Sequence, residues 1–331
     1  MKRREFIYLL SGTAVFGPLV SDAQQLDRLR RMGILMSTAE DDSEGKGRVA
    51  ALLEQLQQLG WTEDQNLRVD RRWAAGEPER TRKFAQELVA LQPDVIVSQN
   101  TAAVPPLIEA TRTIPIVFTQ VTDPVEAGFV SSMARPGGNI TGFTSLESRM
   151  SAKWLEVLKE IAPPVARVAF LFNPETSPFR GANFLREANE AGPKFGLGVV
   201  ATPFRDDSEL ERAIGEFVKQ ANGGLVVLPD ATTNAHRNAI LELAAKHHLP
   251  AVYAFRFFVE AGGLVSYGPD HLDQFRRAAG YVDRILKGTK PGDLPVQQPL
   301  QLQLHLNLKT AKELNLTIPQ SILLRANEVI E

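Results

Sequence analysis

The chain has 331 residues, a formal net charge of −2 and no cysteine. Its length is too great for one ordinary hydrophobic core and fits two domains of roughly 100–150 residues each. A charge so near zero gives no electrostatic footprint for nucleic acid. The lack of cysteine excludes disulfides, thiolate metal sites, a cysteine nucleophile and a lipid anchor on an N-terminal cysteine.

The N-terminal residues have the pattern of an export signal. The basic run Lys2-Arg3-Arg4 precedes a short apolar stretch over 7–20, and small residues at Ser21 and Ala23 predict cleavage after Ala23. This stretch is too short for a stable membrane anchor. The arginine pair resembles a twin-arginine signal, and a Sec signal that carries two arginines is the alternative. We therefore expect residues 1–23 to be removed and the rest to be exported, soluble and free in a periplasm.

Strand and helix patterns alternate after this signal. Short apolar or alternating runs predict strands over 32–37, 67–73, 94–98, 114–119 and 140–143. Helical spacing of apolar residues predicts helices between the first strands, ending near Gly60 and Pro93. The first four of these strands, separated by helical segments, predict a doubly wound α/β lobe. The segment over 134–143, a turn cluster at 135–139 followed by the short run 140–143, breaks this rhythm and predicts the first crossover between the lobes.

A second alternating series follows. It predicts strands over 168–172, 198–202, 225–228, 251–254 and 264–267, with helices over 154–161, 177–195, 210–218, 240–248 and 275–285. No low-complexity linker separates the two series, so we expect a hinge of short strands. The expected division is lobe 1 over 31–142 plus 268–289 and lobe 2 over 143–267 plus 290–331.

Several segments resemble one known family. They are 94–97 with 101–103, 113–118, 121–125, 134–142, and in the tail Asn307, Ala311, 314–319 and Ala326. From about residue 32 to 330 the chain resembles the ABC transporter substrate-binding proteins of the group whose characterised members bind aromatic amino acids such as tryptophan. The resemblance implies the type I periplasmic binding protein fold, with two α/β lobes joined by a three-strand hinge. It also implies import of a small-molecule ligand through an ABC permease in the inner membrane.

Candidate ligand-binding residues follow from the rule that ligands bind beyond the carboxyl ends of strands in open α/β sheets. The residues at or near predicted strand ends are Ser37, Thr38, Asn100, Thr101, Ala102, Gln120, Asp123, Asn173, Asp230, Tyr253, Phe255 and Tyr267. The polar ones have a structural alternative as helix caps or turn residues, and the aromatic ones as core.

The two lobes are expected to supply different groups to the ligand. The free N–H groups at Asn100, Thr101 and Ala102 suit a carboxylate. Asp230 is the candidate counter-ion for a ligand ammonium group, with the N-cap of the next helix as its alternative. The aromatic residues would sandwich an apolar body. This set favours a zwitterion such as an amino acid, whereas a carboxylate without an amine would leave Asp230 idle.

Enzymatic patterns are weak or absent. The run over 45–50 matches the dinucleotide pattern G-x-G-x-x-A, but seven residues separate Ser37 from Gly45, and four of them are acidic and would repel a pyrophosphate. There is no G-x-S-x-G elbow, P-loop or H-E-x-x-H motif. We therefore expect a monomeric receptor with no enzymatic activity, cofactor, metal or nucleic-acid partner. The alternatives are an exported nucleotide-cofactor enzyme, or a ligand sensor of the same fold.

Overall fold

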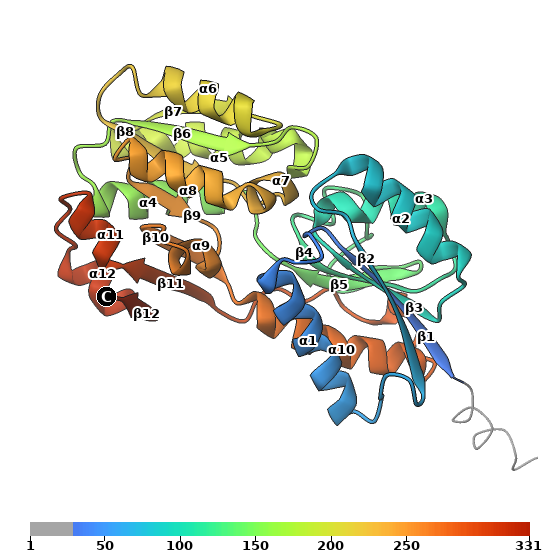
Figure 1. Ribbon diagram of the computed structural model, residues 1–331. Helices are drawn as coiled ribbons and strands as arrows, with labels where there is room; N and C mark the ends of the chain where they lie inside the picture. The colour runs from blue at the N-terminus through green and yellow to red at the C-terminus, as the bar shows by residue number, and fades with distance from the viewer. Residues whose placement is uncertain (1–28) are drawn as a thin grey trace, which may run out of the picture.

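The computed structural model describes residues 29–331, which form two α/β lobes joined side by side (Figure 1). The expected export signal over 1–23 lies outside the described residues. One lobe is built on a five-stranded sheet and the other on a seven-stranded sheet. The predicted fold class, two doubly wound lobes of the type I periplasmic binding protein kind, is confirmed.

The first sheet has the order β2-β1-β3-β4-β5, and all of its strands are parallel. Its strands are β1 (Arg30–Met36), β2 (Leu67–Trp73), β3 (Val95–Gln99), β4 (Ile116–Val121) and β5 (Ile140–Thr144). The central strands β3 and β4 are buried throughout, as their continuous β-branched and apolar runs require. At the sheet edge, β2 alternates and is half-buried, as predicted.

Helices cover both faces of this sheet. Helices α1 (Ser43–Gln58) and α10 (His271–Leu286) pack on one face, against Ile34 and Val97. Helices α2 (Pro78–Ala90) and α3 (Val104–Ala110), with the short η2 (Thr101–Ala103), lie on the other face against Leu35 and Ile96. Because neighbouring strand residues point to opposite faces, each strand contributes to both cores.

The second sheet has the order β12-β11-β10-β9-β8-β6-β7. Only β11 runs antiparallel to its neighbour β10. The strands are β6 (Arg167–Phe172), β7 (Gly198–Pro203), β8 (Gly223–Val227), β9 (Ala251–Tyr253), β10 (Val265–Pro269), β11 (Leu302–Asn307) and β12 (Glu328–Ile330). Strands β6, β8 and β9 are central and almost wholly buried.

The second lobe packs its helices around one large apolar core that includes Trp154, Phe170 and Phe184. Its helices are α4 (Met150–Ile161), η3 (Pro178–Gly181), α5 (Ala182–Ala191), η4 (Gly192–Phe195), α6 (Asp207–Phe217), α7 (Ala231–Ala235), α8 (Arg237–Lys246), α9 (Arg256–Glu260), α11 (Leu308–Glu313) and α12 (Gln320–Arg325). The single helix expected over 177–195 is thus three pieces, because Phe179 and Arg180 have left-handed backbone angles.

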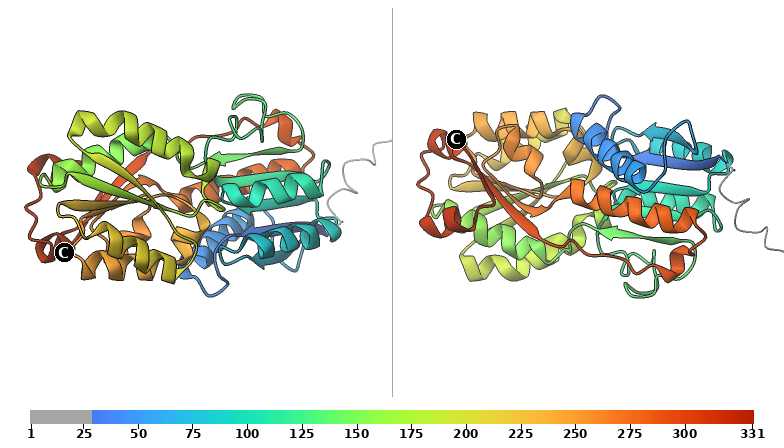
Figure 2. Two further views of the ribbon diagram at one scale, coloured as in Figure 1. Left: turned by 90° about the horizontal axis from the view of Figure 1, so that it is seen from above. Right: turned by 90° about the horizontal axis from the view of Figure 1, so that it is seen from below.

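Three connections join the lobes, at residues 145–149, at Asp270 and at residues 298–301 (Figure 2). None of them is a strand, so the expected hinge of short strands is not what the structure shows. Two expected boundaries differ from the structure. Strand β10 stays in the second sheet as far as Pro269. Residues 291–297, expected in lobe 2, run beside β5 in lobe 1: Thr141 Oγ1 donates to the Leu294 carbonyl (2.6 Å) and Gln297 N donates to the Gly142 carbonyl (2.9 Å). With these changes we propose the same two-lobe division. Among residues 29–331, no helix is long and apolar enough to cross a membrane.

Candidate functional site

The carboxyl ends of the two sheets face each other across the junction of the lobes. Gly76, which follows β2, lies so close to α7 that an added Cβ would be 3.2 Å from the Ala231 carbonyl oxygen. Asp42, which follows β1, forms an ion pair with Arg237 of α8. Each contact joins a loop after a strand in one lobe to a helix after a strand in the other, so the lobes are drawn together.

A cleft with a volume of about 540 Å³ opens on one side of this junction. From lobe 1 it is lined by the start of α2, by Thr101 and Ala102, and by Phe129. From lobe 2 it is lined by residues 174–180, which follow β6. This volume lies in the range of small-molecule sites.

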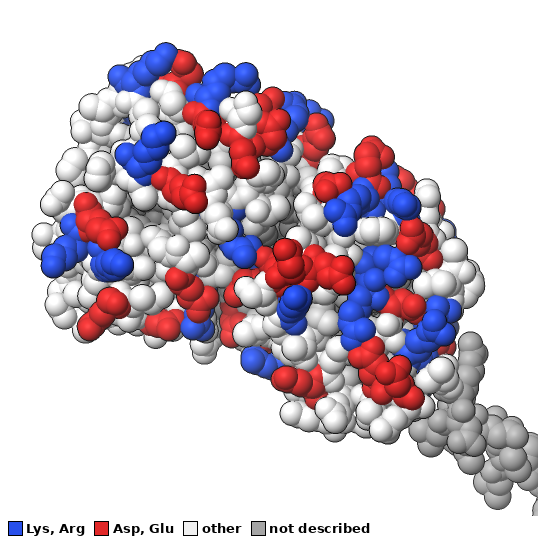
Figure 3. All heavy atoms as spheres, in the orientation of Figure 1, with Lys and Arg blue, Asp and Glu red and all other residues white. Residues whose placement is uncertain are grey.

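A second hollow of about 340 Å³ lies between α1, α9 and the start of α10. Its wall includes Glu44 and Arg48 of α1, Phe255 and Phe257 from around the start of α9, and His271. Figure 3 shows acidic side chains gathered beside the gap between the lobes, over the start of α1.

Several buried polar atoms near the strand ends have no hydrogen-bond partner within residues 29–331. Those on the first sheet include Thr38 Oγ1 and Gln120 Nε2. Those on the second lobe include Ser177 Oγ, after β6, and Asn234 Oδ1, in the helix after β8. A buried polar atom without a partner costs free energy, so native proteins keep such atoms for a bound molecule or water. Thr38 and Gln120 were predicted site residues, whereas Ser177 and Asn234 were not.

A glutamine network holds the strand ends of lobe 1 in place. Ser37 Oγ donates to the Gln99 carbonyl (2.7 Å), and the Ser37 N–H donates to Gln99 Oε1 (3.0 Å). Gln99 Nε2 then donates to Gln120 Oε1 (2.9 Å), and the Gln120 N–H donates to Gln274 Oε1 (3.2 Å). Ser37 is therefore fully engaged in positioning, and Gln120 retains a free amide nitrogen.

Three other predicted residues of lobe 1 are engaged in local structure. Asn100 Oδ1 accepts from the Ala102 N–H (3.4 Å), and Thr101 Oγ1 accepts from the Thr122 N–H (3.0 Å). Asp123 Oδ2 accepts from Ser148 Oγ (2.6 Å), which ties the loop after β4 to the first crossover. Thr101 and Ala102 still line the cleft, whereas Asp123 has the structural role that was its alternative.

Asp230 caps a helix and is saturated by protein groups. It is completely buried and accepts from the Asn173 N–H (3.1 Å), the Thr233 N–H (2.8 Å) and Thr176 Oγ1 (3.1 Å). Burial raises the pKa of its carboxyl to about 6. The structure therefore shows the N-cap role that was the alternative for Asp230, and its pairing with a ligand ammonium stays a prediction.

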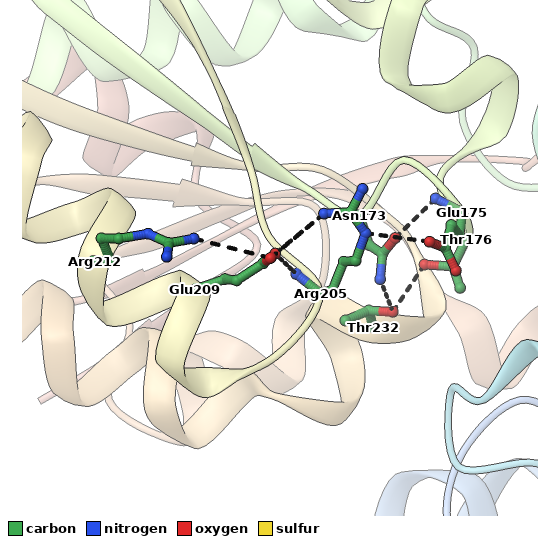
Figure 4. A network of polar contacts seen from close by, with 7 residues as sticks. All are labelled: Asn173, Glu175, Thr176, Arg205, Glu209, Arg212 and Thr232. Atoms are coloured by element: carbon green, nitrogen blue, oxygen red, sulfur yellow. Dashed lines mark hydrogen bonds and ion pairs between the residues drawn. The ribbon is translucent and has the colours of Figure 1, made fainter.

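Asn173 belongs to the same network, which Figure 4 shows from close by. Its Nδ2 donates to Thr232 Oγ1 (3.0 Å), and its Oδ1 accepts from the Glu175 N–H (2.8 Å). On the outer side, Arg205 pairs with Glu175 and Glu209. These contacts fix the loop after β6, whose residues 174–180 line the cleft. Asn173 thus shapes the lining without a free polar group of its own.

The three predicted aromatic residues are separated rather than gathered into one site. Tyr253 lies in the core of lobe 2, stacked on Phe258 at 4.7 Å between ring centroids, and burial raises the pKa of its hydroxyl. Tyr267 is half-buried beside the same core, and its carbonyl accepts from Trp154 Nε1 (2.8 Å). Only Phe255 lines an interlobe hollow. Tyr253 and Tyr267 thus have the core role that was their alternative, and a ligand role for the three aromatic residues together stays a prediction.

Sequence reasoning missed the charged and polar wall of the second hollow. Arg48 and His271 are buried there, and neither Arg48 Nε nor His271 Nε2 has a partner within the described chain. Arg48 belongs to the segment that had been considered only as a nucleotide motif, and no spacing signal marked either residue. In the part of the chain that the structure describes, no group of three His, Asp or Glu side chains is arranged to hold a metal ion.

Comparisons with known proteins agree with this architecture. A family model described as ABC transporter substrate binding protein matches residues 36–330. A tyrosine-binding protein of Clostridioides difficile is 27% identical over 261 residues, which are 79% of this chain and 74% of the relative.

Two solved structures are also similar. A conserved domain protein of Vibrio cholerae has a TM-score of 0.84 and 29% identity, over 91% of this chain and 100% of its own. An ABC domain from Streptococcus pneumoniae in complex with L-Trp has a TM-score of 0.82 and 25% identity, over 91% of this chain and 99% of its own.

Proposed function

The chain belongs to the ABC transporter substrate-binding proteins, and from this premise we propose that it binds an aromatic amino acid between its two lobes. The bound solute would be handed to a permease in the inner membrane for import, without chemical change. The relatives are solute-binding proteins rather than enzymes, and two of them bind tyrosine or tryptophan.

The observation that carries this proposal is the set of unpaired polar atoms at the strand ends of both lobes. Thr38 Oγ1 and Gln120 Nε2 come from one lobe, and Ser177 Oγ and Asn234 Oδ1 from the other. A ligand that bonds to groups of both lobes stabilises the closed arrangement more than the open one. Closure by the ligand is the signal that a permease would read.

The ligand test uses residues 24–331. We expect tyrosine, tryptophan or phenylalanine, among the twenty amino acids, to raise the melting temperature. At a ligand concentration of 100 times Kd the added stability is about 2.7 kcal/mol.

In titration calorimetry, Thr38→Val should weaken binding by roughly 3- to 10-fold, the effect of one hydrogen bond. Ser98→Ala is the control, because Ser98 Oγ is equally buried and unpaired but lies inside β3. The proposal fails if no amino acid changes the melting temperature.

We propose a periplasmic location from the N-terminal pattern of residues 1–23. The family context supports export, since a receptor of an importer must meet its solute outside the inner membrane. Cell fractionation and N-terminal sequencing test this point. A mature chain that starts at Gln24 in the periplasmic fraction is the expected result. An uncut chain in the cytoplasm would instead favour a sensor.

A further inference from the structure

Arg48 is a cation buried where the two lobes meet. Arg48 is 1% exposed, and its Nε and Nη2 atoms have no hydrogen-bond acceptor among residues 29–331. Glu44 Oε2 lies 3.6 Å from Nη2, which is beyond hydrogen-bond distance. Burial lowers the pKa of the guanidinium by more than the nearby carboxylates of Glu44 and Asp42 raise it. A buried charge with so little compensation is costly unless a partner completes it.

The two free nitrogens suit one kind of partner. Nε–H and Nη2–H lie on the same side of a guanidinium, so their hydrogens match the two oxygens of one carboxylate. The side chain lines the hollow of about 340 Å³ between α1, α9 and α10. The fork is therefore buried, has no hydrogen-bond acceptor among residues 29–331, and lies next to a space that can hold part of a small molecule.

The rest of this hollow favours a zwitterion with an apolar part. Phe255 and Phe257 provide aromatic surface, and the Arg48 guanidinium lies 5.4 Å from the centroid of the Phe257 ring. Glu44, Glu260 and Asp270 line the hollow together with Arg256 and Arg276, and Glu260 pairs with Arg256. Carboxylates close to the Arg48 guanidinium suit a ligand that carries an ammonium group near its carboxylate.

We propose that Arg48 binds the α-carboxylate of the transported amino acid in a two-pronged hydrogen bond. This assignment rests on the proposed function and names the group that selects the ligand class. It replaces the predicted carboxylate site at Asn100 and Thr101, whose polar side-chain oxygens already accept from backbone N–H groups. The acidic residues around Arg48 take the place that Asp230 had been expected to fill for the ammonium.

A purely structural role for Arg48 is the competing explanation. Arg48 stacks on Phe257 of the other lobe, and this contact alone favours closure. Arg237 provides a matched control, because its guanidinium lies 5.9 Å from the same ring. Arg237 is paired with Asp42 and does not line the hollow. Loss of Arg237 therefore weakens closure without removing a carboxylate site.

The test is a thermodynamic cycle between Arg48 and the ligand carboxylate. Titration calorimetry compares L-tyrosine with L-tyrosinamide, which keeps the ring and the amine but lacks the carboxylate. We expect the wild type to prefer tyrosine by about 10- to 100-fold, the effect of a charge-assisted hydrogen bond. Arg48→Gln should reduce this preference to about 1-fold. Arg237→Gln should weaken the binding of both ligands by the same factor, so that the preference for tyrosine stays at its wild-type value.

Each outcome decides the assignment. Circular dichroism establishes whether each variant folds. If Arg48→Gln does not fold, Arg48→Lys replaces it in the titrations. Lysine keeps the charge but lacks the fork, so most of the preference should still be lost. A variant of Arg48 that retains the wild-type preference overturns the assignment and leaves amino-acid binding intact. If the wild type binds neither ligand nor any other aromatic amino acid, the proposed function itself fails.

Discussion

Arg237 of α8 forms an ion pair with Asp42, the residue that caps α1, and this pair links the two lobes. The Asp42 side chain is 7% exposed and the Arg237 side chain 23%, so solvent screens the pair only in part. Asp42 also accepts from the Gly45 N–H (2.7 Å), which fixes its carboxylate. The pair exists only while the lobes are together, and it therefore contributes to the closing equilibrium.

Removal of this pair should favour the open form. We expect Arg237→Gln to weaken ligand binding by roughly 3- to 10-fold, since a partly buried pair is worth on the order of 1 kcal/mol. Small-angle X-ray scattering of the ligand-free variant should give a larger radius of gyration than that of the wild type. Arg212→Gln is the control, because the one ion pair of Arg212 within residues 29–331 is with Glu209 of its own helix. Equal affinities for Arg237→Gln and wild type would exclude this role.

A glycine of α1 provides the next prediction, because it has no room for a methyl group. A Cβ on Gly45 would lie 2.3 Å from Thr38 Oγ1 and 2.9 Å from the Trp73 ring. We expect Gly45→Ala to lower the free energy of unfolding by about 1–3 kcal/mol, as overpacking does. The variant should also weaken ligand binding, because Thr38 must move.

Gly47→Ala is the matched control for that change. Its Cβ would meet nothing closer than Leu272 at 4.0 Å. In the interior of a helix, alanine is favoured over glycine by about 0.5–1 kcal/mol. Urea denaturation should therefore show a stable Gly47→Ala variant with unchanged ligand affinity. A Gly45→Ala protein as stable as Gly47→Ala would contradict the close packing.

The sequence predicted the lobes well, because parallel strands in α/β proteins are short apolar runs that alternate with amphipathic helices. The runs at Val95 and Ile116 became central strands, and the alternating run at Leu67 became an edge strand. The turn at Phe179 and Arg180 was missed, since left-handed angles at non-glycine residues depend on tertiary contacts. The return of residues 291–297 to the first lobe was also missed, because it depends on contacts between residues that are distant in the sequence, such as Thr141 and Leu294.

The site was only partly predictable. Thr38 and Gln120 could be proposed because the end of a strand can be read from sequence, and each keeps a buried polar atom without a partner among residues 29–331. Whether a side chain at such an end is free or already bonded cannot be read there, and this is why Asp230 was assigned to the ligand. Arg48 lies within a helix, and only the packing of the second lobe against α1 reveals that its guanidinium is buried.

Asp230 should make the stability of the protein depend on pH. The pKa of its carboxyl is raised from 3.8 to about 6 in the folded state by burial. Between these values the folded state holds more protons than the unfolded state, so stability falls as pH rises from about 4 to about 6. The expected loss is about 3 kcal/mol. Asp230→Asn keeps a capping oxygen and should remove this contribution.

Urea denaturation at pH 4, 5, 6 and 7 measures this effect as the difference between the two proteins. Other titrating groups contribute equally to both, so only the difference in slope matters. Above about pH 7 the difference should be constant, because Asp230 is then ionised in both states. Parallel stability curves over pH 4–6 would show that the buried carboxyl titrates normally.

The strained turn in the lining of the cleft gives the last prediction. Phe179, Arg180 and Gly181 have φ angles of 49°, 57° and 79°, and a Cβ on Gly181 would lie 2.7 Å from the Phe172 ring. Gly181→Ala should therefore lower the free energy of unfolding by about 2–4 kcal/mol, from left-handed strain and the clash together. Gly196→Ala isolates the strain, since its φ is 66° and nothing lies within 4 Å of its Cβ. In urea denaturation, the free energy of unfolding of that variant should be lower than that of the wild type by only about 1 kcal/mol. Equal losses would mean that Phe172 moves freely, and that the turn is not held by the strand beneath it.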